Sequence, residues 1–207
     1  MKKIILASGS PRRKKLLEQI NLVFSVEVPG IRETYDPDLD PDRIVKLLSA
    51  RKAKQVAGNH EDTLVIGADT IVVFQARILE KPGSRQQAIE MLLALSGNTH
   101  QVFTGVTMIK TDGSGNIHSE KSFFEKTDVT FGSIERREAE AYVDTGSPFD
   151  KAGGYGIQDD WGSVFIQKIK GDYYNVVGFP LHAFYQNLKS FAPERLPQSK
   201  KQTADER

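Results

Sequence analysis

Residues 63–74 read TLVIGADTIVVF, and this stretch decides the fold. Its β-branched side chains are typical of a β-strand, and a run that is apolar on both faces is typical of a strand inside a sheet. We therefore predict a central strand here. The one charged residue of the run, Asp69, then shares a face with Val65, Ile71 and Val73, because side chains alternate along a strand.

Strand and helix patterns alternate on both sides of this segment. Ser10-Pro11, Asp40-Pro41 and Ser84 each supply a helix N-cap. Segment 29–40 is rich in Pro, Asp and Glu and lacks periodicity, which predicts a loop. The other strands are expected at 2–7, 22–28, 77–80, 99–110, 119–131 and 163–169, and the helices from Pro11 and at 41–57, 84–96, 134–145 and 180–190.

The composition excludes several classes of protein. The 207 residues include 28 Lys and Arg against 27 Asp and Glu, so the net charge of +1 gives no general attraction to nucleic acid or anionic membrane. The absence of cysteine excludes disulfides, thiolate nucleophiles and cysteine-based metal sites. No apolar run approaches the roughly 20 residues of a membrane span. We expect a cytoplasmic protein with one domain over 1–191 and a disordered tail over 192–207.

The loop ASGSPRR, residues 7–13, lies between the first strand and the first helix. Free N–H groups at a helix N-terminus, together with Arg12 and Arg13, form a cradle for phosphate. The alternative is a capped helix with a solvated basic first turn. Because cations at a helix N-terminus oppose the helix dipole, the phosphate site is favoured.

Lys52 lies on the apolar side of the second expected helix. Ile44, Leu48, Lys52 and Val56 form one row at spacings of four residues. The ammonium either follows the edge of the core to solvent or points into a cleft as a functional group. The sequence leaves both alternatives open.

Asp69 is the strongest single candidate for a functional residue. A buried carboxylate costs several kcal/mol unless it is paired, hydrogen-bonded or bound to a metal. The alternative is a structural carboxylate that caps a turn beside Gly67. Lys81, which precedes Pro82, could lie near Asp69, although a lysine before a turn is usually solvated.

The long segment 146–163 holds five glycines, and long ordered loops are usually functional. Glycines permit close approach of a ligand, and Gln158 offers a donor and an acceptor to a base edge. The alternative is a surface loop with a local pair of Asp150 and Lys151. The chain contains no P-loop, G-x-G-x-x-G, G-x-S-x-G or H-E-x-x-H motif. The remaining groups suit phosphoryl or nucleotidyl chemistry with a hard divalent ion.

Five short motifs, in order along the chain, resemble the Maf family of nucleoside triphosphate pyrophosphatases. They are LASGSPRR at 6–13, GADT at 67–70, EKP at 80–82, TGV at 104–106 and DKAGGYGIQ at 150–158. The resemblance implies an α/β fold with a mixed, strongly bent sheet flanked by helices and two lobes around a nucleotide cleft, similar to inosine triphosphate pyrophosphatases. It also implies cleavage between the α and β phosphates, with links to septum formation and removal of non-canonical nucleotides.

Position by position, the resemblance implies that Ser8, Arg12 and Arg13 bind the triphosphate. It also implies that Glu33, Lys52, Asp69 and Lys81 surround a divalent metal, Mg²⁺ or Mn²⁺, and the scissile phosphate. Asp69 and Glu33 would hold the metal and orient or deprotonate a water for attack at the α-phosphorus, and Gln158 would contact the base.

The forms SPRR and GADT are similar to the branch that acts on dTTP and UTP. One departure is Gln158-Asp159-Asp160-Trp161, where many relatives have glycine after the glutamine, and the two acids and the indole could alter base recognition. The resemblance also implies a homodimer, with no nucleic acid or membrane partner. Two alternatives are a regulator of cell division that binds nucleotide without turnover, and an RNA-binding module that uses the basic cluster at 12–15.

Overall fold

The computed structural model describes residues 3–158 and 161–197, and in it the chain forms a seven-stranded mixed sheet. The strands run in the order β2-β1-β3-β5-β6-β7, and β4 pairs with the end of β3. β2, β1 and β3 are parallel, and the other pairs are antiparallel. The strands are β1 (Lys3–Ala7), β2 (Ser25–Val26), β3 (Thr63–Phe74), β4 (Arg77–Leu79), β5 (Thr99–Thr111), β6 (Ile117–Phe131) and β7 (Ile166–Lys170). Segment 63–74 is the central strand, as predicted.

The helices begin close to the residues that the capping pattern predicts. The hydroxyl groups of Ser10 and Ser84 accept hydrogen bonds from backbone N–H groups of the first turns that follow. Asp40 makes no side-chain cap bond, which corrects its expected role. The helices are α1 (Pro11–Gln19), α2 (Pro41–Ala57), α3 (Arg85–Leu95), α4 (Arg136–Val143), α5 (Tyr173–Val177) and α6 (Leu181–Phe191), with 3₁₀ turns η1 (Ser147–Asp150), η2 (Ala152–Gly154), η3 (Trp161–Phe165) and η4 (Pro193–Arg195).

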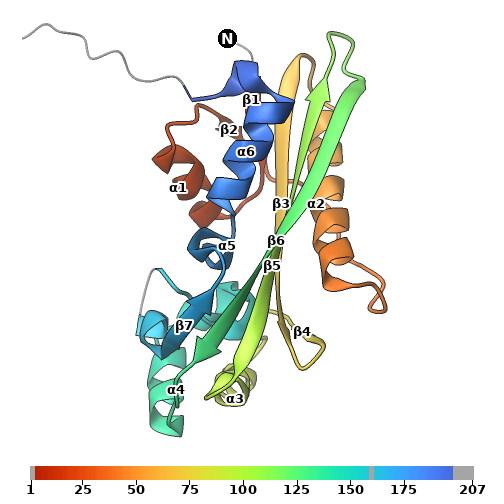
Figure 1. The fold of residues 1–207 in the computed structure, drawn as a ribbon. Helices are drawn as coiled ribbons and strands as arrows, with labels where there is room; N and C mark the ends of the chain where they lie inside the picture. Colours follow the sequence, from red (N-terminus) through yellow and green to blue (C-terminus); the bar gives the residue numbers. More distant parts are fainter. Residues whose placement is uncertain (1–2, 159–160, 198–207) are drawn as a thin grey trace, which may run out of the picture.

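The helices cover the sheet unevenly and divide the molecule into two lobes, one around α1, α2 and α6 and the other around α3 and α4 (Figure 1). α2 covers one face of the sheet, α1 and α6 cover the other, and α3 and α4 lie at the far end of the long strands (Figure 1). One apolar core joins β1, α1 and α6, and a second joins α3, α4 and the 3₁₀ turns. The mixed α/β architecture that the resemblance implies is confirmed.

The backbone of α2 lies unusually close to the sheet at two glycines. A Cβ atom on Gly67 of β3 would lie 2.3 Å from the carbonyl oxygen of Ser49. A Cβ atom on Gly105 of β5 would lie 2.3 Å from the carbonyl oxygen of Val45. Only glycine permits this approach, which places the side chains of α2 directly over β3.

Several elements differ from the expectation. The strand expected at 22–28 is reduced to β2, because only Ile5 and Leu6 of β1 pair with it. The five-residue helix α5 was not predicted, since it is too short to show periodicity.

The expected disordered tail overlaps the described structure. η4 lies within it, and the Arg195 guanidinium donates to the carbonyl oxygens of Lys3 and Asp62 at 3.0 and 3.1 Å. Residues 198–207 lie outside the described residues. Within 3–158 and 161–197, no helix is both long and apolar enough to cross a membrane.

Candidate active site

A cleft of about 410 Å³ lies between the two lobes and collects residues from both. Its walls include the β1–α1 loop, the loop before α2, β3, the segment after β4 and the glycine-rich segment around 150–158. All eight residues that the sequence proposes for the site line this one cleft: Ser8, Arg12, Arg13, Glu33, Lys52, Asp69, Lys81 and Gln158. Segments far apart in the sequence therefore form one site.

A carboxylate–ammonium–carboxylate group lies on the α2 side of the cleft. Asp69 of β3 is only 6% exposed, and its Oδ1 accepts a hydrogen bond from the Lys52 ammonium of α2. The same ammonium lies 2.5 Å from Glu33 Oε1. Lys52 therefore points into the cleft, which answers the question that the sequence left open. Asp69 has a charged partner and does not cap a turn.

The two carboxylates have different protonation behaviour. Burial raises the pKa of Asp69, although the positive charges of Lys52 and Arg13 oppose this shift. Burial also acts to raise the pKa of Glu33, but the hydrogen bond and charge of Lys52, helped by Lys81, outweigh it and lower the pKa. Of two neighbouring carboxylates whose pKa values are shifted in opposite directions, the one with the raised pKa takes up a proton more readily and the other stays ionised.

The Arg13 guanidinium donates most of its hydrogen bonds to other groups of the protein. Its guanidinium donates to the carbonyl oxygens of Gly178 and Ala68 at 2.9 Å, to Thr70 Oγ1 at 2.9 Å and to Ser8 Oγ at 3.2 Å. Burial lowers its pKa. Four of the five guanidinium N–H groups are thus used, and Arg13 ties the β1–α1 loop to β3 and to the end of α5.

Arg12 lies at the mouth of the cleft and contacts the other lobe. Its Nη1 lies 2.9 Å from Asp150 Oδ2, and Lys151 Nζ lies 2.8 Å from Asp150 Oδ1. Lys81 and Gln158 line the cleft without a side-chain hydrogen bond to another described residue. These two side chains can therefore contact a ligand without losing a protein partner.

The family model described as Maf-like protein matches residues 3–191. The chain belongs to the Maf-like family. Proteins named dTTP/UTP pyrophosphatase from Bacillus anthracis and from Bacillus cereus (strain ATCC 10987 / NRS 248) are each 48% identical over 191 residues. These alignments cover 92% of this chain and 96% and 91% of the two relatives. The family resemblance inferred from the five motifs is confirmed.

A solved structure with similarity to this chain is that of the Staphylococcus aureus Ham1 protein. The similarity covers 63% of this chain and 72% of the Ham1 chain, at 20% sequence identity and a TM-score of 0.34.

Some cleft residues of this family member were not assigned roles from the sequence. Tyr35 donates a hydrogen bond to Glu80 at 2.7 Å, and burial together with Glu80 raises the pKa of Tyr35 to about 12. Thr70 accepts from Arg13, and Tyr155 hydrogen-bonds to the buried His100 at 2.6 Å. The one sequence feature that could have indicated Glu80 is its position directly before Lys81. No feature indicates Tyr35, since residues in a loop show no periodicity.

The segment after Gln158 lies partly outside the description. Asp159 and Asp160 fall outside the described residues. Trp161 packs in η3 with its ring centroid 6.2 Å from that of Phe165 and is not among the residues that line the cleft. Its proposed effect on base recognition therefore stays a prediction.

The donor set fits a divalent metal of the Mg²⁺ type. Asp69 and Glu33 offer hard carboxylate oxygens on the same side of the cleft. Within the described part of the chain, no group of three or more His, Cys, Asp or Glu side chains is placed to hold a metal. Two carboxylates with substrate phosphates are a common Mg²⁺ environment, so the residues present are compatible with an ion that arrives with a nucleotide.

Proposed function

We propose that this protein hydrolyses dTTP and UTP to the nucleoside monophosphate and pyrophosphate. The observation that carries the proposal is the buried Asp69, bound to Lys52 at the floor of a cleft lined by further cations. Support comes from relatives named dTTP/UTP pyrophosphatase, which are 48% identical to this protein over 92% of its chain.

In the proposed mechanism the triphosphate enters between the lobes. Arg12, Lys81 and the β1–α1 loop bind the phosphate oxygens and hold the α-phosphorus near Asp69. Lys52 offsets the charge that develops on these oxygens and on the pyrophosphate leaving group. Arg13 contributes charge and holds the loop in place.

Asp69 is the proposed proton acceptor for the attacking water. Its burial, which raises its pKa, makes it a better base than an exposed carboxylate. Glu33, which stays ionised, orients the water and the Lys52 ammonium. When bound by Asp69 and Glu33, a divalent cation would neutralise phosphate charge and lower the pKa of a bound water.

The preference for pyrimidine bases is proposed to depend on Gln158. Its amide can donate and accept at once, and it lines the cleft without a described protein partner. The reaction would take place in the cytoplasm, in a homodimer, and would serve nucleotide-pool sanitation or control of septum formation. Analytical ultracentrifugation of the full chain tests the dimer.

The test is pyrophosphate release from dTTP, UTP, CTP, ATP, GTP and ITP, with Mg²⁺, with Mn²⁺ and with chelator. Asp69→Asn is compared with a control, Asp144→Asn, whose carboxylate pairs with Arg85 on the surface. Metal-dependent release from dTTP and UTP, lost only in Asp69→Asn, supports the proposal. Saturable binding without release would instead favour a nucleotide-binding regulator.

A further inference from the structure

One hydrogen bond joins the two segments that bring Glu33 and Lys81 to the cleft. The Tyr35 hydroxyl donates to Glu80 Oε1 at 2.7 Å. Tyr35 lies two residues after Glu33, and Glu80 directly precedes Lys81. This contact therefore bears directly on the distance between Glu33 and Lys81.

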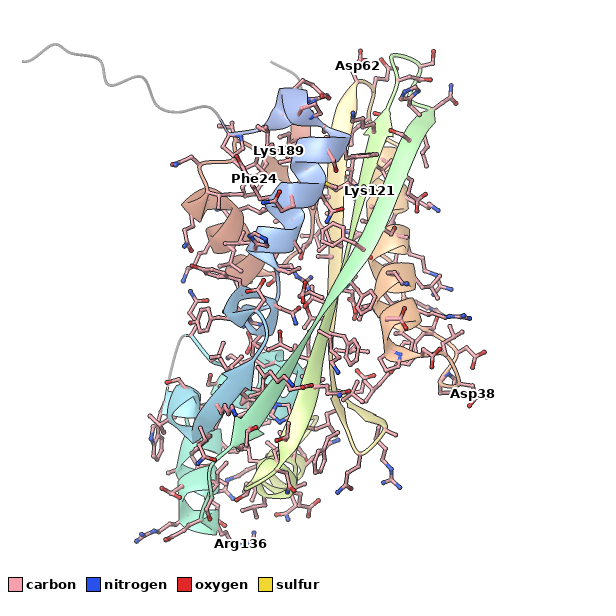
Figure 2. The ribbon with its side chains drawn as sticks, viewed as in Figure 1. Phe24, Asp38, Asp62, Lys121, Arg136 and Lys189 are labelled. Carbon is pink, nitrogen blue, oxygen red and sulfur yellow. The ribbon has the colours of Figure 1, made fainter. Side chains whose placement is uncertain are left out.

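The segment that carries Glu33 has little regular structure of its own. Residues 29–36 form neither helix nor strand, and the Glu33 side chain is 57% exposed. Arg51 of α2 donates to the carbonyl oxygen of Thr34, and Tyr35 packs against the apolar cluster between α2 and β3. Asp38 lies at the outer side of this loop, beside the start of α2 and well away from the end of the molecule that carries Asp62 (Figure 2).

Glu80 lies in a segment that makes more backbone contacts with the rest of the fold than the loop of Glu33 does. Leu79, the last residue of β4, pairs with Val72 of β3, and the Glu80 carbonyl oxygen accepts a 3.4 Å hydrogen bond from the Gly153 N–H. Pro82 is buried. The β4 end is thus tied to the sheet and to the glycine-rich segment, and it offers a fixed point to which the loop can attach.

We propose that the Tyr35–Glu80 hydrogen bond is a positioning contact that holds Glu33 opposite Lys81 around Asp69. The inference rests on the proposed pyrophosphatase function and adds two positioning residues to it. Neither side chain has to touch the substrate: Tyr35 restrains the loop, and Glu80 supplies the acceptor. Without this bond the loop keeps its apolar packing, its Arg51 contact and the ion pair between Glu33 and Lys52, but the backbone that carries Glu33 samples a wider range of positions.

The test removes only the hydroxyl or only the acceptor. Tyr35→Phe keeps the ring that packs on the core, Glu80→Ala removes the acceptor, and Glu80→Gln keeps an acceptor oxygen without the charge. The control is Tyr185→Phe, a half-exposed tyrosine on α6, which covers the other face of the sheet from α2 (Figure 1). Melting temperatures establish that each variant is folded.

The expected kinetic pattern is a loss in kcat with KM preserved. Tyr35→Phe and Glu80→Ala should each lower kcat for dTTP about tenfold, the effect of one lost hydrogen bond to a charged acceptor. KM should stay within about twofold of the wild-type value, because the phosphate-binding residues are unchanged. The double variant should be no slower than either single variant, and Glu80→Gln should recover most of the rate.

Three results would overturn the inference while leaving the proposed function intact. These are wild-type kcat in Tyr35→Phe, a raised KM with unchanged kcat, and losses that multiply in the double variant. The second would mean that the hydroxyl binds substrate directly.

A wild-type protein that released no pyrophosphate would refute the proposed function instead. Hydrogen exchange of the amides at 31–39 then tests the contact without turnover. Faster exchange in Tyr35→Phe but not in Tyr185→Phe supports it, and unchanged exchange refutes it.

Discussion

Gly67→Ala tests whether the close packing of α2 against the sheet is what brings Lys52 to Asp69. The new methyl group would lie 2.3 Å from the carbonyl oxygen of Ser49, 2.8 Å from the Ala53 nitrogen and 3.0 Å from the Ala53 Cβ. Ordinary contact begins near 3.4 Å, so this turn of α2 must lift by about 1 Å. Backbone atoms form most of the obstacle, so no side-chain rotation relieves it.

The displaced turn is the one that carries Lys52, and Asp69 follows Gly67 on the same face of β3. Overpacking of this kind costs about 1–3 kcal/mol of stability. A misplacement of about 1 Å at a catalytic group can lower the rate by on the order of 100-fold. We therefore expect both a lower free energy of unfolding and a lower kcat.

The assay pairs urea unfolding with pyrophosphate release from dTTP. Gly132→Ala is the control, because the nearest atom to its new methyl group is 3.9 Å away. This control should keep both stability and activity. If Gly67→Ala also kept both, the argument that the glycine positions Lys52 would be wrong.

Three further outcomes are expected. Asp69→Asn should lower kcat by about 100-fold or more, because a neutral amide cannot accept the proton, and unchanged turnover would reject its role. Burial lowers the pKa of His100 to about 4. In the unfolded chain this imidazole binds a proton below about pH 6.5, whereas in the folded protein it does so only near pH 4. The free energy of unfolding is therefore highest above about pH 6.5, and it falls by about 2 kcal/mol from pH 7 to pH 5. Urea unfolding of His100→Gln should lack that decrease. Arg195→Met should cost about 1 kcal/mol through its lost bonds to two carbonyl oxygens, and Arg136→Met, which changes an exposed side chain, should cost nothing measurable by thermal melting.

Periodicity was sufficient to single out Lys52 and Asp69. Each is a charged residue in an otherwise apolar row, and a charge in such a row needs a partner. The structure shows that each is the partner of the other. Glu33 lies in a loop without hydrophobic periodicity, so its charge is not unusual in its local sequence. Only the family resemblance indicated that Glu33 belongs to the site.

The two arginines show where sequence reasoning stops. Arg12 and Arg13 are adjacent and chemically identical, and the sequence assigned both to the triphosphate. In the fold Arg12 faces the mouth of the cleft and pairs with Asp150, whereas Arg13 turns inward to Gly178 and Ala68. Neighbouring residues on a helix point in directions about 100° apart, so their different environments arise from what packs beside them.

The sequence by itself determined the central strand, the helix starts at Ser10 and Ser84 and the family of the chain, because these depend on local patterns of side-chain type. The tertiary structure alone decided which side chains meet in the cleft. The meeting of Lys52, Asp69 and Glu33 depends on α2 lying against two glycines of the sheet, and that of Tyr35 and Glu80 on how a loop packs. Contacts between distant segments are set by packing of the whole chain, which no local pattern contains.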